Sequence, residues 1–234
     1  MRNKIHFIAL EGVSIFKQLQ LEEALLRTEE KSFCLVNFGS PRAIVMGISN
    51  QPDKLLNREK VIKDRVPVIQ RFSGGGTVIV DEGTLFITFI ISKEHIPIQA
   101  FPETIHRWVA DLYTSAWNIP DFHYRENDYV IGERKCGGNA QYIRKDRWLH
   151  HTSFLWDYRE ENMDYLLLPT KRPQYRQDRT HNDFLCRLKD WESNSKILIS
   201  KLQEELVKQL YIESFDLKQK KKKRHRKSTR FLEM

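Results

Sequence analysis

The segment Gln70-Arg71-Phe72-Ser73-Gly74-Gly75-Gly76-Thr77-Val78 places three consecutive glycines between two stretches typical of β-strands, residues 66–70 and 77–80. Glycine has no Cβ, so its backbone N–H groups can approach a ligand closely and its φ angle can be positive. Such a loop suits an anionic group, and an arginine beside it adds a planar donor for a carboxylate or a phosphate. A flexible hairpin without a ligand is the alternative interpretation. The spacing does not match the Walker A motif, which ends in Gly-Lys-Ser/Thr.

The sequence around this loop alternates between strand-like and helical patterns. Apolar residues recur at helical spacing in residues 15–27, 102–117 and 197–211. Glu22 and Glu23 lie away from the apolar stripe of the first of these helices, so we expect both on its solvated face. Further strands are predicted at residues 5–10, 33–38, 43–47, 84–92, 129–132, 135–143 and 148–157. The order predicts an α+β fold, a single domain with a mixed, mostly antiparallel β-sheet flanked by helices.

The positive charge of the chain is concentrated at its C-terminal end. The formal net charge is +8, and residues 218–234 contain nine of the 39 basic residues and one of the 31 acidic residues. The first 217 residues are therefore neutral, which gives no reason to expect nucleic-acid binding by the folded body. We expect a domain of residues 1–217 and a disordered basic tail of residues 218–234, whose deletion should leave folding intact.

The cysteines and the apolar pattern indicate a compartment. Cys34, Cys136 and Cys186 are far apart and form no Cys-x-x-Cys pair, which favours a reducing environment and argues against structural zinc. No stretch approaches the roughly 18 apolar residues that a membrane helix needs. Residues 1–10 lack a secretory pattern. These features predict a cytoplasmic protein without membrane association.

A second informative segment surrounds Lys135. The lysine enters a strand with two glycines, Gly137 and Gly138, so its ammonium group has open space around it. A single lysine is usually a solvated surface charge, but here Asn127-Asp128 on the preceding hairpin arm can contact a metal-bound phosphate or a ribose. His150-His151 lies on the next strand. Adjacent strand residues point to opposite faces, so only one of these histidines can face a site shared with Lys135, and a buried histidine with a satisfied partner is the alternative.

In their order and spacing, these motifs resemble the lipoate–protein ligase A family, which has the biotin/lipoate protein ligase catalytic-domain fold. The resemblance covers roughly residues 7–154 and includes a helix like the family's first, Gln20-Leu21-Glu22-Glu23-Ala24-Leu25. The Gly-Arg-Gly-Arg-type loop of biotin-attaching relatives is absent. Two departures stand out. The family's paired arginine is Gln70-Arg71 here, and its His-His-Gly is His150-His151-Thr152.

The resemblance implies roles for individual residues. Lys135 matches the family's essential catalytic lysine, which contacts both the acyl carboxylate and the α-phosphate. Asn127 and Asp128 match the nucleotide side, with Asp128 as the Mg²⁺ ligand. The remaining substrate- and nucleotide-binding positions are Arg71, Ser73, Gly74, Gly75 and Gly76 in the loop over the lipoyl and phosphate groups, and Gly137, Ala140 and His151 in the adenylate pocket.

The same resemblance implies a lipoate–protein ligase that activates lipoate or octanoate with ATP and transfers the acyl group to a protein lysine. ATP and Mg²⁺ form the substrate complex, and no tightly bound cofactor is expected. The acceptors would be lipoyl domains of 2-oxoacid dehydrogenase complexes or the glycine cleavage H protein. Residues 1–234 include no separate accessory domain of the kind many bacterial ligases possess, so an accessory subunit is a further expected partner.

Two other functions stay open. An acyltransferase of the same fold moves octanoyl or lipoyl groups through a cysteine thioester without ATP. Its nucleophile would be Cys136, which should point away from the face of Lys135, or Cys186, whose apolar neighbours suggest a buried thiol. A non-catalytic binding module that contacts nucleic acid through residues 220–227 is the third interpretation, and such a module would not need Lys135 in this setting.

Overall fold

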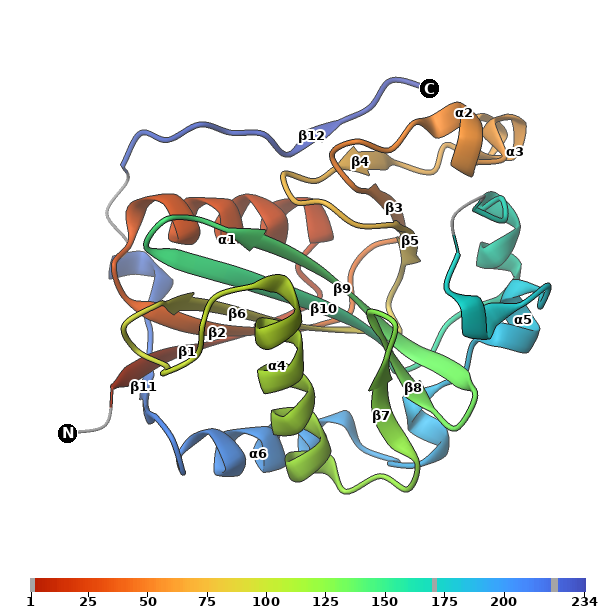
Figure 1. Cartoon of the computed structure of the whole chain (residues 1–234). Coiled ribbons are helices and arrows are strands. Elements are labelled where there is room, and N and C mark those ends of the chain that lie inside the picture. Colours follow the sequence, from red (N-terminus) through yellow and green to blue (C-terminus); the bar gives the residue numbers. More distant parts are fainter. Residues whose placement is uncertain (1–2, 170–171, 220–222) are drawn as a thin grey trace.

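The computed structural model describes residues 3–169, 172–219 and 223–234. An eight-stranded sheet with the order β11-β1-β2-β6-β10-β9-β8-β7 forms its centre (Figure 1). β1 is parallel to β2 and β11, and the other neighbouring strands are antiparallel. The strands are β1 (Lys4–Glu11), β2 (Ser32–Phe38), β6 (Thr84–Ser92), β7 (Phe122–Arg125), β8 (Asp128–Ile131), β9 (Arg134–Ile143), β10 (Arg147–Leu155) and β11 (Tyr211–Ser214). The expected α+β fold with a mixed, mostly antiparallel sheet is confirmed.

A four-stranded sheet carries the glycine-rich loop. Its strand order is β12-β4-β3-β5, and only β3 and β4 are parallel. The strands are β3 (Ala43–Met46), β4 (Val68–Gln70), β5 (Thr77–Val80) and β12 (Arg230–Phe231). The loop of residues 71–76 connects β4 to β5, which confirms the strand–loop–strand pattern of the sequence.

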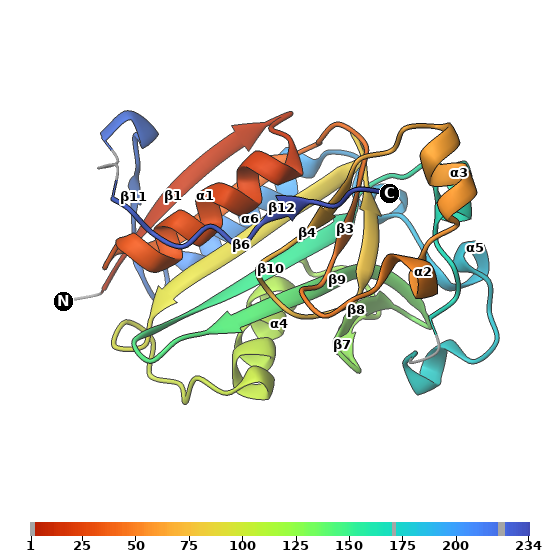
Figure 2. The same ribbon diagram turned by 90° about the horizontal axis from the view of Figure 1, so that it is seen from above.

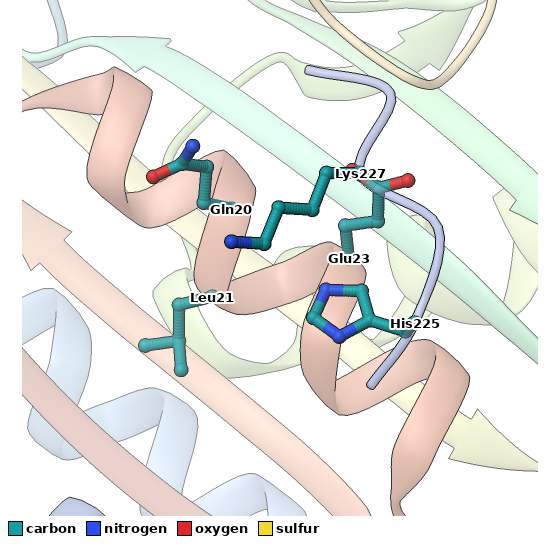
Figure 3. A pocket seen from close by; sticks show the side chains of 5 residues that line it. All are labelled: Gln20, Leu21, Glu23, His225 and Lys227. Atoms are coloured by element: carbon teal, nitrogen blue, oxygen red, sulfur yellow. The ribbon is translucent and has the colours of Figure 1, made fainter. Parts of the chain in front are cut away.

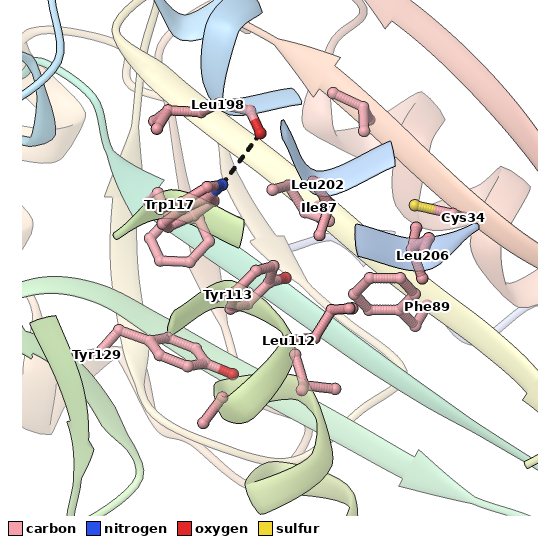
Figure 4. Packing of buried hydrophobic residues seen from close by; sticks show 14 of the residues in the cluster. Cys34, Ile87, Phe89, Leu112, Tyr113, Trp117, Tyr129, Leu198, Leu202 and Leu206 are labelled. Carbon is pink, nitrogen blue, oxygen red and sulfur yellow. Dashed lines mark hydrogen bonds between the residues drawn. The ribbon is translucent and has the colours of Figure 1, made fainter. Parts of the chain in front are cut away.

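Helices cover the two faces of the large sheet (Figures 1 and 2). On one face, α1 (Ile15–Thr28) packs with Phe33 and Ile90 of the sheet, and the four-stranded sheet lies beside it. On the other face, α4 (Pro102–Trp117) and α6 (Ser195–Leu206) bury the alternate residues of the same strands. We call these the α1 face and the α4/α6 face. Figure 4 shows the aromatic core of the α4/α6 face, where the indole of Trp117 donates a 3.0 Å hydrogen bond to the Leu198 carbonyl.

Shorter elements connect these layers. They are the helices α2 (Pro52–Leu55), α3 (Arg58–Lys63) and α5 (His181–Phe184), and the 3₁₀ turns Glu160–Tyr165, Gln174–Arg176, Leu188–Asp190 and Leu217–Gln219. In the described part of the chain, no helix has both the length and the apolar character needed to cross a membrane.

The basic tail is folded where the structure describes it, so the expectation of disorder is wrong for residues 223–234. This segment runs along α1, and its strand β12 pairs antiparallel with β4 (Figure 2). The Phe231 ring stacks on Phe16 at 4.1 Å between centroids. Residues 220–222 lie outside the described part. The expectation was based on the basic composition of the whole segment. Its last residues are more apolar, and they pair with the edge of β4 and stack on Phe16.

Glu22 and Glu23 are also placed differently from the expectation. Their residues are 0% and 1% exposed, respectively, so neither lies on a solvated helix face. Glu22 accepts a 2.8 Å hydrogen bond from the Gln18 side chain, and Glu23 accepts a 3.0 Å bond from Arg27. The helix is covered on more than one side, so its apolar stripe marks only part of its buried surface.

Candidate functional site

The ammonium group of Lys135 is held in a defined position at the start of β9. Its Nζ lies 2.7 Å from Asp128 Oδ1, with the two side chains 23% and 11% exposed. The Tyr175 hydroxyl donates a 2.9 Å hydrogen bond to the other carboxylate oxygen of Asp128. Burial, followed by the charge of Asp128, raises the pKa of Tyr175, so the phenol keeps its proton. Lys135 is therefore a partly accessible, oriented cation.

A β-bulge places Lys135 on the α1 face. In the register of β8 with β9, Tyr129 pairs with Gly137 and Val130 pairs with Lys135, so Cys136 is an additional residue in β9. An additional residue reverses the alternation of side chains at that point. A Cβ built on Gly138 would lie 3.1 Å from Lys135 Nζ. Lys135 and Gly138 therefore share one face although they are three residues apart.

Gly137 faces the opposite side. A Cβ built there would lie 2.6 Å from the ring of Phe154, a residue of the α4/α6 core. We had expected Gly137 to line the adenylate pocket near Lys135. In the structure it lies on the opposite face. The missing side chain makes room for Phe154 instead.

Arg71 lies behind the glycine-rich loop, 5% exposed. Its Nη2 donates hydrogen bonds of 2.8 Å to the Gly74 carbonyl and 2.9 Å to the Gly76 carbonyl. Burial lowers the pKa of Arg71 to about 10, so the guanidinium remains charged at neutral pH. The side chain organises the loop from inside, whereas the sequence suggested a direct contact with the anion.

Other groups hold the remaining carbonyls of the loop. The Ile48 N–H donates to the Ser73 carbonyl at 3.0 Å, and the Asn50 side chain donates to the Gly75 carbonyl at 3.1 Å. The N–H groups of residues 74–76, in contrast, donate no hydrogen bond to the described part of the chain. The loop thus turns its acceptors toward the protein and leaves three donors free for a ligand.

The glycine-rich loop lies against the middle of β9. Gly75 has a φ of +106°, and a Cβ there would lie 2.7 Å from Arg71 Nη2 and 3.9 Å from the Ala140 side chain. Only glycine combines this conformation with so close an approach. The expected neighbours Gly75 and Ala140 are brought together, and Ala140 is paired with His151 on β10.

His151 points to the α1 face, as the alternation requires of one of the two histidines. Its Nδ1 lies 2.9 Å from Glu22 Oε1 and 3.0 Å from the Thr88 hydroxyl. His150 points the other way, where its Nε2 lies 3.0 Å from the Tyr129 hydroxyl. The sequence alone could not assign Glu22 as the partner of His151.

Asn127 occupies the turn that leads into β8. Its φ is +74°, a conformation that asparagine adopts more readily than most residues. The Asn139 side chain donates a 2.5 Å hydrogen bond to the Asn127 carbonyl, and the Tyr124 hydroxyl donates to its side-chain oxygen at 3.3 Å. The turn therefore fixes the strand that carries Asp128.

A basic segment lies near Lys135, within residues 169–183, which the sequence indicated as a polar, basic loop without assigning it to the site. Arg176 is 5% exposed, and one of its guanidinium nitrogens, Nη2, has no partner among the described residues. Burial, followed by the charges of Arg176 and Lys135, lowers the pKa of His181 to about 4. Arg176 and Lys135 are therefore two cations close to Asp128, with the uncharged His181 imidazole beside them. The sequence signal was the repetition of arginine at positions 172, 176 and 179.

The two candidate cysteine nucleophiles lie in the core of the α4/α6 face. The Cys136 thiol donates to the Tyr129 carbonyl at 3.3 Å, and the Cys186 thiol donates to the Arg134 carbonyl at 3.5 Å. Burial raises the pKa of Cys136, whereas the hydrogen bond with Cys136 lowers the pKa of Cys186. Neither thiol faces the glycine-rich loop.

Metal binding by the protein alone is not supported in residues 3–169, 172–219 and 223–234. These residues contain no group of three or more His, Cys, Asp and Glu side chains that could hold a metal ion. A single carboxylate such as Asp128 suits Mg²⁺ that arrives with phosphate oxygens and water as its other ligands.

Comparisons with known proteins agree with this fold. Residues 14–211 match the family described as the Lipoyl protein ligase A/B catalytic domain. The chain is 28% identical to the inactive lipoate–protein ligase 2 of Plasmodium falciparum over 80% of this chain and 64% of that protein. It is 33% identical to a probable lipoate-protein ligase A of Mycoplasma pneumoniae over 58% of this chain and 41% of that protein. The chain thus spans less than two thirds of either relative.

Solved structures show the same fold. A lipoate-protein ligase A bound with ATP superimposes with a TM-score of 0.74 at 15% identity, covering 93% of this chain and 91% of that chain. The bipartite lipoate protein ligase of Thermoplasma acidophilum, described with its E2 lipoyl domain, has a TM-score of 0.74 at 16% identity, covering 93% of this chain and 89% of that chain. The match over residues 14–211, supported by this architecture, shows that the chain belongs to the lipoyl protein ligase A/B catalytic domain family.

Proposed function

We propose that the protein is an ATP-dependent lipoate–protein ligase that joins lipoate or octanoate to a lysine of an acceptor domain through an acyl-adenylate. The observation that carries the proposal is the position of Lys135. Its ammonium, 2.7 Å from Asp128, shares the α1 face with a loop whose three glycine N–H groups have no hydrogen-bond partner in the described part of the chain. Cations and free amides on one face suit two anionic substrates that must react with each other.

In the first step, a carboxylate oxygen of the acid attacks the α-phosphorus of ATP, and pyrophosphate leaves. Negative charge increases on the α-phosphate as the new bond forms, and preorganised donors stabilise it. Lys135 is suited to contact both the carboxylate and the α-phosphate, and the N–H groups of residues 74–76 are suited to the phosphate or carboxylate oxygens. Arg176 offers a further donor in its Nη2, which has no partner within residues 3–169, 172–219 and 223–234. Asp128 keeps the ammonium in place before the substrates arrive and fits a Mg²⁺ that enters with ATP.

In the second step, the neutral amine of an acceptor lysine attacks the acyl carbon, and AMP leaves. The proposed acceptors are lipoyl domains of 2-oxoacid dehydrogenase complexes or the glycine cleavage H protein. The Thermoplasma ligase is described as bipartite and with an E2 lipoyl domain, which supports a lipoyl-domain acceptor and an accessory subunit for this chain as well.

One relative is named an inactive ligase, so a binding module without catalysis is the competing function. The Lys135–Asp128 pair favours catalysis, because a module that only binds has no need of an oriented ammonium beside free amides. The acyltransferase alternative lacks support, since Cys136 and Cys186 are buried on the other face.

The test is direct. The pure protein is incubated with an apo lipoyl domain, Mg²⁺ and lipoate, with and without ATP, and the acceptor is weighed by mass spectrometry. We expect a lipoyl mass increase that requires ATP, together with release of pyrophosphate. Lys135→Ala is the matched negative control. Transfer from an acyl-carrier donor without nucleotide would instead establish the acyltransferase function, and nucleotide binding without either product would establish the binding module.

A further inference from the structure

The C-terminal strap, residues 223–234, is attached to a buried carboxylate of α1. Glu23 accepts hydrogen bonds from the Ser228 N–H at 2.9 and 3.1 Å and from the Thr229 N–H at 3.3 Å. Figure 3 shows Glu23 beside the strap, where His225 and Lys227 border a hollow of about 230 Å³. Glu23 is 1% exposed, so the strap covers it. A buried carboxylate with backbone donors is a strong local attachment.

A continuous series of hydrogen bonds connects the strap to the glycine-rich loop. The guanidinium of Arg230 donates to Gln70 Oε1 at 3.1 and 3.0 Å. Gln70 Nε2 donates to the Ile48 carbonyl at 3.0 Å, and the Ile48 N–H donates to the Ser73 carbonyl at 3.0 Å. The strap thus reaches the loop through two intermediate residues.

Packing reinforces this connection. The Phe231 ring stacks on Phe16 at the start of α1, and Leu232 N–H donates to the Val68 carbonyl at 2.8 Å. Leu232 and Met234 pack against the buried cluster beneath the four-stranded sheet. Without β12, β4 would present an unpaired edge next to the loop. The strap therefore joins α1, β4 and the loop into one unit.

We propose that the strap is a positioning element of the proposed active site. It fixes Gln70 and, through Ile48, the carbonyl side of the glycine-rich loop, so that the N–H groups of residues 74–76 stay directed toward the substrates. Arg230 is the positioning residue, and Glu23 is its anchor. The inference rests on the proposed function only for the identity of the substrates. It replaces our expectation that loss of residues 218–234 would have no effect on the fold.

The test compares Arg230→Met with Arg226→Met in the full-length protein. Methionine keeps the aliphatic stem of arginine and removes the donors. Arg226 is an exposed basic residue of the same strap that forms no hydrogen bond, ion pair or ring contact with the described residues, so it is the matched control. Hydrogen exchange is followed at the amides of Gly47 and Ile48, which donate to the loop carbonyls of Gly76 and Ser73. Binding of ATP is measured by calorimetry, and KM and kcat are measured separately.

For Arg230→Met we expect faster exchange at these two amides and a rise in KM for ATP of about tenfold, the size expected for a lost charge-assisted hydrogen bond, with kcat nearly unchanged. Arg226→Met should behave like the wild type. Deletion of residues 223–234 should give a larger effect of the same kind. Wild-type exchange and ATP affinity in both Arg230→Met and the deletion would overturn the proposal, as would a uniform rise in exchange throughout the large sheet.

The exchange and calorimetry measurements do not require turnover. If the wild-type protein lacks ligase activity, the proposed function fails, but the role of the strap in holding the loop is still decided by these two measurements. If the wild type is active and both Arg230→Met and the deletion of residues 223–234 leave loop exchange and ATP affinity unchanged, the strap proposal alone fails.

Discussion

The two faces of β9 and β10 carry residues that are neighbours in the sequence but lie in different surroundings. On the α1 face, Lys135, Gly138 and His151 adjoin free amides and buried carboxylates. On the α4/α6 face, the sequence neighbours Cys136, Gly137 and His150 are enclosed by aromatic rings. Each residue of the first group is adjacent in the sequence to one residue of the second group. The face to which a residue points, and not its type, separates the proposed site from the core.

The histidines show how the environment makes this difference. Burial lowers the pKa of His150 well below its ordinary value, and its ring is enclosed beside Tyr129 and His106. His151 instead has the carboxylate of Glu22 at 2.9 Å and is 8% exposed. One ring is a neutral core residue, and the other lies within a polar network next to the glycine-rich loop.

The largest effect is expected from Lys135→Ala on the α1 face. Removal of a preorganised charge of this kind costs on the order of 10²–10³ in rate, so adenylate formation should be nearly lost. Lys135→Arg should also fail, because a planar guanidinium cannot replace a compact ammonium. Formation of the acyl-adenylate is measured by pyrophosphate release, and thermal denaturation checks that the variant is folded, because Asp128 loses its ion-pair partner. Lys145→Ala, at an exposed position, is the control. A near wild-type rate in Lys135→Ala would remove the basis of the proposed mechanism.

The second prediction uses pH to test the α4/α6 face. Burial lowers the pKa of His106 from 6.5 to about 4, and its Nε2 has no partner among the described residues. The pKa of His106 is lower in the folded state than in the unfolded state. The stability of the fold with a neutral His106 is therefore fully present above pH 6.5, and it is lost as the pH falls toward 4 because the unfolded chain binds a proton first. At 1.36 kcal/mol per pKa unit, the loss approaches about 3 kcal/mol.

His106→Gln should therefore flatten the dependence of the free energy of unfolding on pH, measured by urea denaturation between pH 7.5 and 4. The exposed His123→Gln should leave the slope unchanged. Equal slopes in wild type and His106→Gln would show that His106 is not the residue that titrates on this face.

The third prediction compares adjacent glycines. A Cβ at Gly137 would lie 2.6 and 2.9 Å from ring atoms of the buried Phe154, so Gly137→Ala should destabilise the protein by about 1–3 kcal/mol, as overpacking does. A Cβ at Gly138 would meet the flexible end of Lys135, at 3.1 Å, and Asp128 Oδ1 at an ordinary contact distance of 3.9 Å, so Gly138→Ala should keep the melting temperature and reduce adenylation. Thermal denaturation and pyrophosphate release are measured for both variants. The same loss of stability in the two variants would contradict the assignment of faces.

Local patterns predicted much of the fold. The helical spacing of residues 102–117 corresponds to α4 without change, and the strands on both sides of the glycine-rich loop are β4 and β5. The final helix was less well placed. Residues 195–206 form α6, whereas β11 begins at Tyr211 and pairs with β1 at the other end of the sequence. Periodicity describes a single segment and is insensitive to a distant partner of this kind.

The unpredicted parts of the site depend on distant contacts. The bulge at Cys136 exists only in the pairing of β9 with β8, so no spacing rule indicated that Lys135 and Gly138 share a face. Glu23 meets Ser228 across 205 positions, and the Tyr175–Asp128 hydrogen bond spans 47. Each of these contacts requires the completed fold before the residues meet.

The smallest effect is expected from the thiols of the α4/α6 face. Cys136 and Cys186 are 0% and 2% exposed and belong to the core, on the side opposite Lys135. Cys136→Ser and Cys186→Ser each place a hydroxyl in an apolar site, so a stability loss of about 1–3 kcal/mol is expected. ATP-dependent acyl transfer should remain within about twofold of wild type, because neither substitution changes a group that contacts the proposed substrates. The transfer is measured below the melting transition by mass spectrometry of the acceptor. An acyltransferase would behave in the opposite way, because loss of its thiolate removes the thioester on which transfer depends. An inactive cysteine variant that still folds would therefore move the reactive residue from the α1 face to the α4/α6 face and reverse the comparison between them.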